Sequence, residues 1–399
     1  MKTQISQPDS KAYTSACEVP RAWYNVLADL PTPLGAYLSP ADRSPLPPQA
    51  LSAIFPESLI EQEFGDRRFY NIPEPVREAL AKWRPTPLVR ATALEKALGV
   101  RSRIYFKNES VSPSGSHKSN SAVPQAYFNQ MAGIKRLTTE TGAGQWGTAL
   151  AMACRHFGLD LRVFMVRVSF EQKPYRKILM NLMDAEVLPS PSHLTRAGLE
   201  ALAKDPETPG TLGLAISEAI EEAAGRADTN YALGSVLNHV VLHQTVIGLE
   251  AQAQLEAADE TPDYLIACHG GGSNFGGLVA PFVPDLLLGK GPKVIAAEPA
   301  VCPTLTKGKM TYDYGDTAGL TPLMPMYSLG VDFQPPAIHS GGLRYHGASP
   351  ITSALLAEKL ISAQAMESSD VYRYAPGFSP KLRISYRPRN QATPWLAPV

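Results

Sequence analysis

Residues 264–278 read YLIACHGGGSNFGGL, a β-prone run that ends in three consecutive glycines and continues as a predicted helix. Backbone N–H groups of glycines at the start of a helix can surround a phosphate, and the helix dipole adds partial positive charge there. A tight glycine turn without a ligand is the plain alternative. The stretch lacks the G-x-G-x-x-G spacing of a dinucleotide loop and the G-K-[ST] of a Walker loop. It therefore favours a phosphate monoester bound between a strand and a helix.

Strands and helices alternate on both sides of this stretch. Other β-prone runs cover 103–107, 135–140, 161–168, 186–189, 230–234 and 292–299. Helical patterns cover 121–132, 146–157, 173–185, 195–204, 213–226, 239–258 and 351–365. Such alternation predicts mostly parallel sheets covered by helices, an α/β fold whose ligands gather at the carboxyl ends of the strands.

A lysine lies in a loop of small residues, SPSGSHKSNSA (112–122), directly before a predicted helix. A single loop lysine is usually a solvated surface charge. Small neighbours allow a planar ring to approach the backbone, the helix start offers N–H groups to an anion, and His117 adds a flat aromatic face. Together these features favour Lys118 as a nucleophilic amine towards an aldehyde cofactor.

A third glycine-containing junction, TTETGAGQWG (138–147), follows another predicted strand. Its backbone amides from Gly142 to Gln145 can bind a carboxylate in the manner of an anion nest. Taken alone, Glu140 is readily explained as an exposed charge at a helix N-terminus. The surrounding glycines favour instead a carboxylate that faces the ligand.

Composition excludes several other classes of function. Lys+Arg and Asp+Glu both number 37, so no net charge favours nucleic acid or an anionic membrane. The four cysteines form no C-x-x-C pair, which argues against a zinc site and against a disulfide scaffold. The first 20 residues lack the apolar core of a secretory signal, and no uncharged apolar run approaches the ~20 residues of a membrane span. These features predict a cytoplasmic enzyme that acts on small molecules and holds no metal.

The three motifs, in this order and at about these separations, resemble the β chain of tryptophan synthase. The chain is similar to the divergent second class of β chains, with GQWG where the commoner class has histidine, and with SFEQKPYRK and FQPPAIHSGGLRYHG. The resemblance implies a fold-type II pyridoxal-phosphate enzyme with two three-layer α/β/α domains and the cofactor between them. Residues 1–83 plus 117–234 would form the N-terminal domain, with a mobile part that closes over the substrate. Residues 84–116 plus 235–365 would form the C-terminal domain that binds the cofactor phosphate.

The same resemblance assigns roles to individual residues. Lys118 would bind pyridoxal 5'-phosphate as a Schiff base and shuttle protons, while Glu140 would lie beside the incoming nucleophile. The remaining cofactor-binding residues would be His117, Asn120, Gly270, Gly271, Gly272, Ser273 and Asn274. Residues that bind the amino-acid substrate would be Thr141, Gly142, Ala143, Gly144, Gln145 and Asp332.

The implied reaction is β-replacement, which converts L-serine and indole to L-tryptophan and water. The implied partners are a second copy of the chain, as a homodimer, and a tryptophan synthase α chain. A serine or threonine dehydratase, or a cysteine synthase, would share the fold and the cofactor. Those families prefer serine to histidine beside the lysine and lack the E-T-G-A-G-Q-W segment. A homologue that binds a partner without catalysis is the remaining alternative.

The C-terminal end departs from the family pattern. Residues 371–399 hold five basic residues, five prolines and no acidic residue, and they lack the S-G-H-G-type loop that the family places near the cofactor ring nitrogen. Residues 366–399 therefore form either a natural basic tail or a frameshifted or truncated end. If they replace the usual closing segment, we expect the sheet of the C-terminal domain to expose apolar surface, and the enzyme to be impaired.

Overall fold

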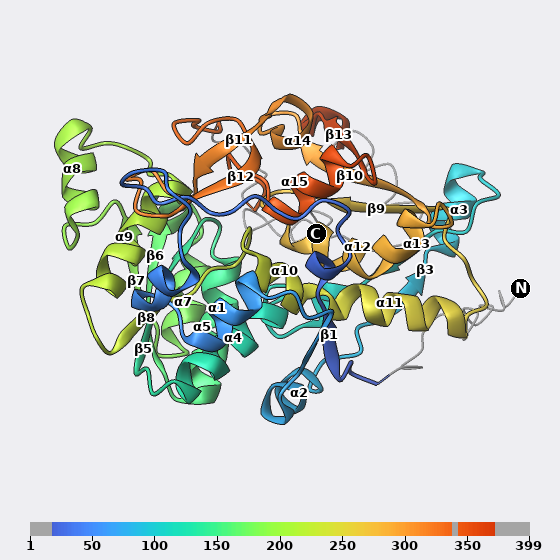
Figure 1. The fold of residues 1–399 in the computed structure, drawn as a ribbon, viewed down its shortest axis with the longest axis horizontal. Helices are drawn as coiled ribbons and strands as arrows, with labels where there is room; N and C mark the ends of the chain where they lie inside the picture. The colour runs from blue at the N-terminus through green and yellow to red at the C-terminus, as the bar shows by residue number, and fades with distance from the viewer. Residues whose placement is uncertain (1–17, 337–341, 372–399) are drawn as a thin grey trace, which may run out of the picture.

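The computed structural model describes residues 18–336 and 342–371, which are built around two parallel sheets (Figure 1). The larger sheet has the strand order β7-β6-β5-β8, and every neighbouring pair is parallel. Its strands are β5 (Arg136–Thr141), β6 (Asp160–Val166), β7 (Glu186–Ser190) and β8 (Thr229–Tyr231). The smaller sheet, β13-β10-β9, is also parallel and consists of β9 (Tyr264–Cys268), β10 (Lys293–Pro299) and β13 (Ser362–Met366). The predicted α/β fold with mostly parallel sheets is confirmed.

Helices cover both faces of the larger sheet. Successive side chains of β6 point to opposite faces, so they pack into two different hydrophobic cores. Val163 and Met165 belong to one hydrophobic core, and Phe164 and Val166 to the other. The first core also contains residues of α4 (Ser119–Met131), α5 (Gln145–Phe157) and α7 (Pro174–Asn181), and the second contains residues of α9 (Leu212–Ala224). The connections include α6 (Arg167–Gln172) before α7 and α8 (Arg196–Lys204) before α9.

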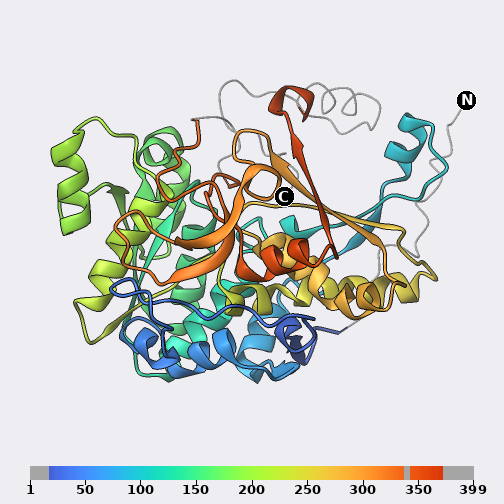
Figure 2. The ribbon, with the colours of Figure 1, turned by 45° about the horizontal axis from the view of Figure 1, so that its top comes forward.

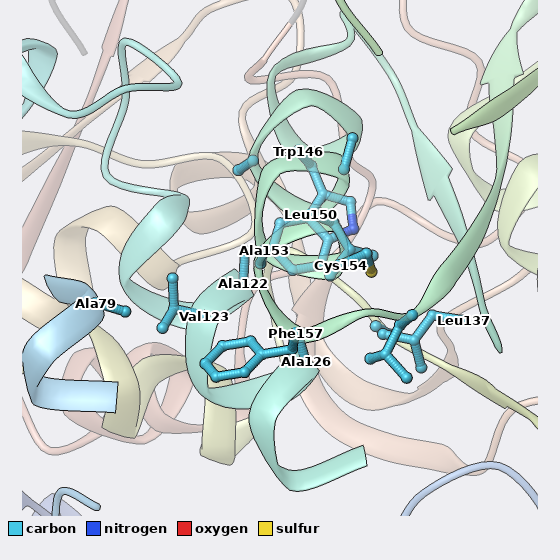
Figure 3. Packing of buried hydrophobic residues seen from close by; sticks show 14 of the residues in the cluster. Ala79, Ala122, Val123, Ala126, Leu137, Trp146, Leu150, Ala153, Cys154 and Phe157 are labelled. Carbon is cyan, nitrogen blue, oxygen red and sulfur yellow. The ribbon is translucent and has the colours of Figure 1, made fainter. Parts of the chain in front are cut away.

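Small side chains bring α4 and α5 close together (Figure 3). Ala122 and Ala126 of α4 and Ala153 of α5 are at most 1% exposed. Trp146 stands at the first turn of α5, in the same cluster. This packing fixes the start of α5 relative to the start of α4, and both of these helix ends carry predicted site residues.

The smaller sheet is covered by described helices on one face only (Figure 2). Leu265, Val294 and Ala296 share a core with α12 (Ser273–Val279) and α15 (Pro350–Ala357). On the other face Tyr264 is 53% exposed and Ile266 is 62% exposed. Parallel sheets are normally buried on both faces, so these two exposed side chains of β9 depart from the usual pattern. Of the predicted tail, residues 366–399, Met366 is the last residue of β13, and residues 372–399 lie outside the described residues.

The remaining elements surround the two sheets. Antiparallel pairs are formed by β1 (Ala22–Tyr24) with β2 (Phe69–Asn71), β3 (Leu88–Arg90) with β4 (Tyr105–Lys107), and β11 (Lys309–Tyr314) with β12 (Leu323–Ser328). The other α-helices are α1 (Glu57–Phe64), α2 (Glu74–Leu80), α3 (Thr92–Leu98), α10 (Asn238–Gln244), α11 (Val246–Ala257), α13 (Val283–Leu287) and α14 (Thr304–Lys307). Short 3-10 helices are η2 (Val26–Ala28), η3 (Pro48–Ala53), η4 (Glu109–Val111) and η5 (Ala280–Phe282).

Two predicted helices differ from the observed elements. The prediction of one helix over 351–365 is wrong, because α15 ends at Ala357 and Lys359 adopts a left-handed φ of 59°. Residues 362–366 then pair with β10 as a strand. The helix predicted over 239–258 is divided at Thr245, whose hydroxyl donates to the Leu242 carbonyl at 2.7 Å.

The division into two domains remains a prediction. Within residues 18–336 and 342–371, none of the helices has the length and apolar character required to cross a membrane.

Candidate active site

Lys118 follows a serine loop that is hydrogen-bonded to itself. The Ser112 hydroxyl donates to the Ser116 carbonyl at 2.6 Å and accepts the Ser116 N–H at 3.0 Å. The hydroxyls of Ser114 and Ser119 lie 2.8 Å apart. These local bonds shape a loop that has no strand partner and hold the lysine at the N-terminal end of α4.

The Lys118 amine points at the turn that follows β8. Its Nζ donates to the Gly234 carbonyl at 2.7 Å. Burial lowers the pKa of Lys118 to about 8, against the opposing effects of the Glu140 carboxylate and the Cys268 thiol. An amine with a pKa in this range is partly neutral near physiological pH, so it can act as a nucleophile and as a base.

His117 lies beside the lysine as a neutral imidazole. Burial, followed by the positive charge of Lys118, lowers the pKa of His117 to about 3. Its Nε2 lies 3.4 Å from the Ser273 hydroxyl, whereas its buried Nδ1 has no hydrogen-bond partner among the described residues. An unpaired buried nitrogen beside a reactive amine indicates room for a polar ligand group.

The glycine loop between β9 and α12 has no space for side chains. A Cβ on Gly271 would lie 2.5 Å from the Ser235 hydroxyl, and Gly272 has a φ of 107°. The Ser273 hydroxyl lies 3.2 Å from that of Ser235 and 3.4 Å from the Gly234 carbonyl that also binds Lys118. The loop and the lysine therefore share one site, to which Ser235 contributes a hydroxyl that the sequence did not identify.

Asn274 is oriented back towards the strand. Its side-chain N–H group donates to the Cys268 carbonyl at 3.2 Å and to the Cys268 thiol at 3.3 Å. It therefore braces the glycine loop against the end of β9.

Glu140 lies near the carboxyl end of β5 and is 6% exposed. The Tyr231 hydroxyl donates to its Oε2 at 2.5 Å. Burial raises the pKa of Glu140 to about 7, while the Tyr231 hydroxyl, the backbone N–H of Gly234 and the Lys118 charge oppose that rise. Glu140 can therefore change its protonation state near neutral pH, which suits a general acid–base group.

Residues 141–145 turn from β5 into α5 and cap that helix. The Thr141 hydroxyl accepts the Gly147 N–H at 3.2 Å, so it braces the turn from inside. Gly144 has a φ of 92°, and a Cβ there would lie 2.9 Å from the Arg176 side chain. Gly142 and Ala143 are partly exposed, as is Gln145, so the turn can be reached by a ligand.

Two predicted site residues lie away from this group. The Asn120 side chain belongs to a buried network, in which it accepts from Arg84 at 2.7 Å and donates to Glu109 at 2.9 Å and to Gln244 at 3.1 Å. Asp332 is exposed after β12, where its charge acts on His346. The structure therefore brings together Lys118, His117, Glu140 and the two glycine loops, but not Asn120 or Asp332.

An apolar cavity adjoins Glu140 and Tyr231. Its walls include Phe55 from the segment before α1, Ile216 of α9 and Met324 of β12. Apart from Glu140, the cavity lining contains no charged side chain. The sequence did not predict Tyr231 as part of the site; only the pairing of β8 with β5 brings it beside Glu140.

These residues fit pyridoxal phosphate. Lys118 supplies an amine for the aldehyde, and His117 offers a neutral imidazole with an unpaired nitrogen. The loop of residues 270–272 forms a cradle that any Cβ would narrow, flanked by the hydroxyls of Ser235 and Ser273. This donor set suits a phosphate monoester without a metal ion.

Comparison with known proteins agrees with this fit. Residues 80–344 match the family described as pyridoxal-phosphate dependent enzyme. The fold is similar to that of a threonine deaminase from T.th., with a TM-score of 0.55 and 20% identity over 77% of this chain and 86% of that one. A fungal L-serine ammonia-lyase from Rhizomucor miehei has a TM-score of 0.54 and 16% identity over 75% of this chain and 81% of that one. At these identities the likeness shows the fold alone.

Sequence relatives are much closer. Tryptophan synthase beta chain 2 of Thermotoga maritima is 58% identical over 91% of this chain and 86% of its own length. The proteins of that name from Aquifex aeolicus and Methanosarcina acetivorans are 55% and 52% identical, over 92% and 94% of this chain and 86% and 85% of their own. These identities favour the predicted β chain over the dehydratase alternative. The chain belongs to the tryptophan synthase beta chain family of pyridoxal-phosphate dependent enzymes.

Proposed function

We propose that this chain catalyses β-replacement, in which L-serine and indole give L-tryptophan and water. When bound, pyridoxal phosphate supplies a conjugated ring that takes up the negative charge left at Cα. The observation that carries the proposal is an ionisable carboxylate, Glu140, at the edge of an apolar cavity and electrostatically coupled to the Lys118 amine.

Lys118 would carry the cofactor and then move protons. With a pKa of about 8 its neutral amine can remove the Cα proton of serine, and the resulting ammonium can protonate the departing hydroxyl. The Gly234 carbonyl, 2.7 Å from Nζ, would orient the amine during these transfers. One residue can thus act first as base and then as acid.

Glu140 would select and activate the second substrate. Indole is a flat apolar ring system with one N–H donor, and the cavity offers apolar walls with one carboxylate. As C3 of indole attacks, positive charge develops on the ring nitrogen, and ionised Glu140 would stabilise it. The Tyr231 hydroxyl, bound to Oε2 at 2.5 Å, would hold the carboxylate in place for the indole N–H.

The glycine loops would hold the charged ends of the ligands. Residues 270–274 would bind the cofactor phosphate, and residues 141–145 would bind the carboxylate of serine. His117 would lie against the cofactor. Asn120 would position the helix that follows Lys118, because its polar atoms bind Arg84 and Glu109. A role for Asp332 in closure over the amino acid would require that loop to move.

The proposal is tested with Glu140→Gln in the presence of pyridoxal phosphate. We expect cofactor and serine binding to survive, and tryptophan formation to slow by about 10²-fold, as for loss of one general acid–base group. Glu218→Gln is the matched control, because Glu218 is a buried carboxyl bonded to Ser192 and Thr195, outside the site. Steady release of pyruvate from serine, unaffected by indole, would instead identify a dehydratase.

We propose that the chain forms a homodimer in the cytoplasm. The homodimer would bind a tryptophan synthase α chain. The resemblance and the names of the relatives support the α chain partner. Sedimentation at micromolar concentration, with and without an α chain, measures both associations. Monomer throughout the concentration range would contradict the dimer.

A further inference from the structure

Trp146 is buried beside the proposed catalytic residues, and the proposed reaction gives it no role. It is 4% exposed at the first turn of α5 (Figure 3). Its indole Nε1 donates to the Thr139 hydroxyl at 2.6 Å, and that hydroxyl donates to the Ala232 carbonyl at 2.5 Å. Trp146 is thereby tied to the strand that carries Glu140 and to the segment that leads to Gly234.

The face of the Trp146 ring lies against Gly234. A Cβ built on Gly234 would lie 2.5 Å from Cδ2 and 2.6 Å from Cγ of the indole. No side chain can stand there, so the ring occupies the space that any other residue at 234 would need. Contact at the α-carbon restricts both backbone dihedral angles of Gly234.

Those two angles set the direction of two groups that face the proposed catalytic residues. The Gly234 carbonyl accepts from Lys118 Nζ at 2.7 Å, and the Gly234 N–H stabilises the Glu140 carboxylate. The carbonyl and the N–H lie on either side of the α-carbon under the Trp146 ring. A rotation at Gly234 would therefore misdirect both groups together.

Gln125 of α4 holds the preceding residue from the other side. Its Nε2 donates to the Leu233 carbonyl at 2.8 Å, and its Oε1 accepts the Leu233 N–H at 3.1 Å. Nε2 also donates to the Ser121 hydroxyl at 2.8 Å. This two-bond clamp fixes the Leu233 backbone to the helix that begins just after Lys118.

We propose that Trp146 and Gln125 are positioning residues that hold the Leu233–Gly234 segment, so that Gly234 orients Lys118 and Glu140 at once. The inference deepens the proposed function and rests on it for the roles of Lys118 and Glu140.

The test measures how fast apoprotein captures pyridoxal phosphate as a function of pH, which reports the free amine of Lys118 rather than turnover. We expect the wild-type rate to be half-maximal near pH 8. In Trp146→Leu the carbonyl is no longer held towards the ammonium, so the half-point falls by about one pH unit. Gln125→Leu removes both bonds to Leu233 without adding a charge, and we expect a smaller shift in the same direction.

A double-mutant cycle separates positioning from general damage. In the protein that retains Trp146, Gly234→Ala pushes a methyl group into the indole ring. We therefore expect the pH of half-maximal capture to shift at least as far as in Trp146→Leu. In the Trp146→Leu background the methyl has room, and Gly234→Ala adds little, so the two effects are not additive. Phe157→Leu, at the far end of the same helix, is the control: it lowers thermal stability but leaves the half-point unchanged.

Two outcomes would overturn the inference. One is a folded Trp146→Leu protein, judged against Phe157→Leu by its thermal transition, whose half-point equals that of wild type. The other is full additivity of Trp146→Leu and Gly234→Ala. Failure of the proposed function gives a different result, because Lys118→Ala protein would then still capture the cofactor covalently.

Discussion

The hydroxyl of Tyr231 provides a sharp test of how Glu140 is tuned. Tyr231→Phe removes one oxygen and leaves the ring, which packs against Phe55 at a centroid distance of 5.9 Å. The lost hydroxyl donates to Glu140 Oε2 at 2.5 Å, and it is the first of the contacts that oppose the effect of burial on the Glu140 pKa. Without it, the ionised carboxylate is less stable, so the pKa must rise above about 7.

The size of the change follows from the value of one hydrogen bond to a charged group. Such a bond contributes about 1.5–3 kcal/mol, which corresponds to about one to two pH units. At pH 7.5, Glu140 of the wild type, with a pKa of about 7, is about three-quarters ionised. In Tyr231→Phe, with a pKa about one to two units higher, it is about 3–25% ionised. Tryptophan formation limited by ionised Glu140 should therefore slow by about 3- to 25-fold at pH 7.5.

The assay follows tryptophan formation from serine and indole between pH 6 and 10. We expect the acid limb of the profile to move upward by about one to two pH units, and the variant to regain most of its rate at high pH. Tyr105→Phe is the control, because it removes an equivalent hydroxyl–carboxylate contact, 2.9 Å to Glu260, outside the site. A Tyr231→Phe profile that is lower at every pH but unshifted would refute the reasoning, since it would mean that Tyr231 does not tune Glu140.

Three further predictions concern the lysine, the buried network and the open sheet face. Lys118→Ala should abolish the cofactor label that borohydride fixes to the protein, as peptide mapping would show; label on another lysine would contradict the assignment. Asn120→Ala leaves Arg84 and Glu109 short of partners, and should lower the free energy of unfolding in urea by about 1–3 kcal/mol. Ile266→Lys, at a side chain 62% exposed, should reduce concentration-dependent association by light scattering; stability should change by less than about 0.5 kcal/mol.

Local sequence was sufficient to predict the parts of the site that are built from turns. A helix start, and glycines between a strand and a helix, offer backbone N–H groups to an anion in any tertiary context. This is so because N–H orientation and positive φ angles are local properties of the chain. The strands that carry the two glycine turns were predictable from alternation, and in each of the two parallel sheets the turn follows the carboxyl end of its strand. Lys118, Glu140 and the 270–272 loop follow from such reasoning.

Contacts between distant segments could not be predicted in this way. Tyr231 reaches Glu140 across 91 positions of the chain, and nothing in NYALG distinguishes a site tyrosine from a core tyrosine. The sequence likewise does not predict that Trp146 packs on Gly234, or that Arg84 donates a hydrogen bond to Asn120. The error at 351–365 has a related cause, since ISAQAM can follow a helix and becomes a strand only because β10 offers it an edge.

The two titrating residues of the site depend on each other. Burial lowers the pKa of Lys118 and raises that of Glu140, which brings them to about 8 and about 7 from ordinary values that are far apart. Each charge still stabilises the other, so loss of the positive charge on Lys118 raises the pKa of Glu140 further. The Lys118 ammonium that forms on removal of the Cα proton therefore favours ionised Glu140. Once that ammonium has protonated the departing hydroxyl, Lys118 is neutral and this support is lost. The Tyr231 hydroxyl and the Gly234 N–H would then keep the carboxylate ionised for the indole N–H, so the electrostatics of the site depend on all three groups.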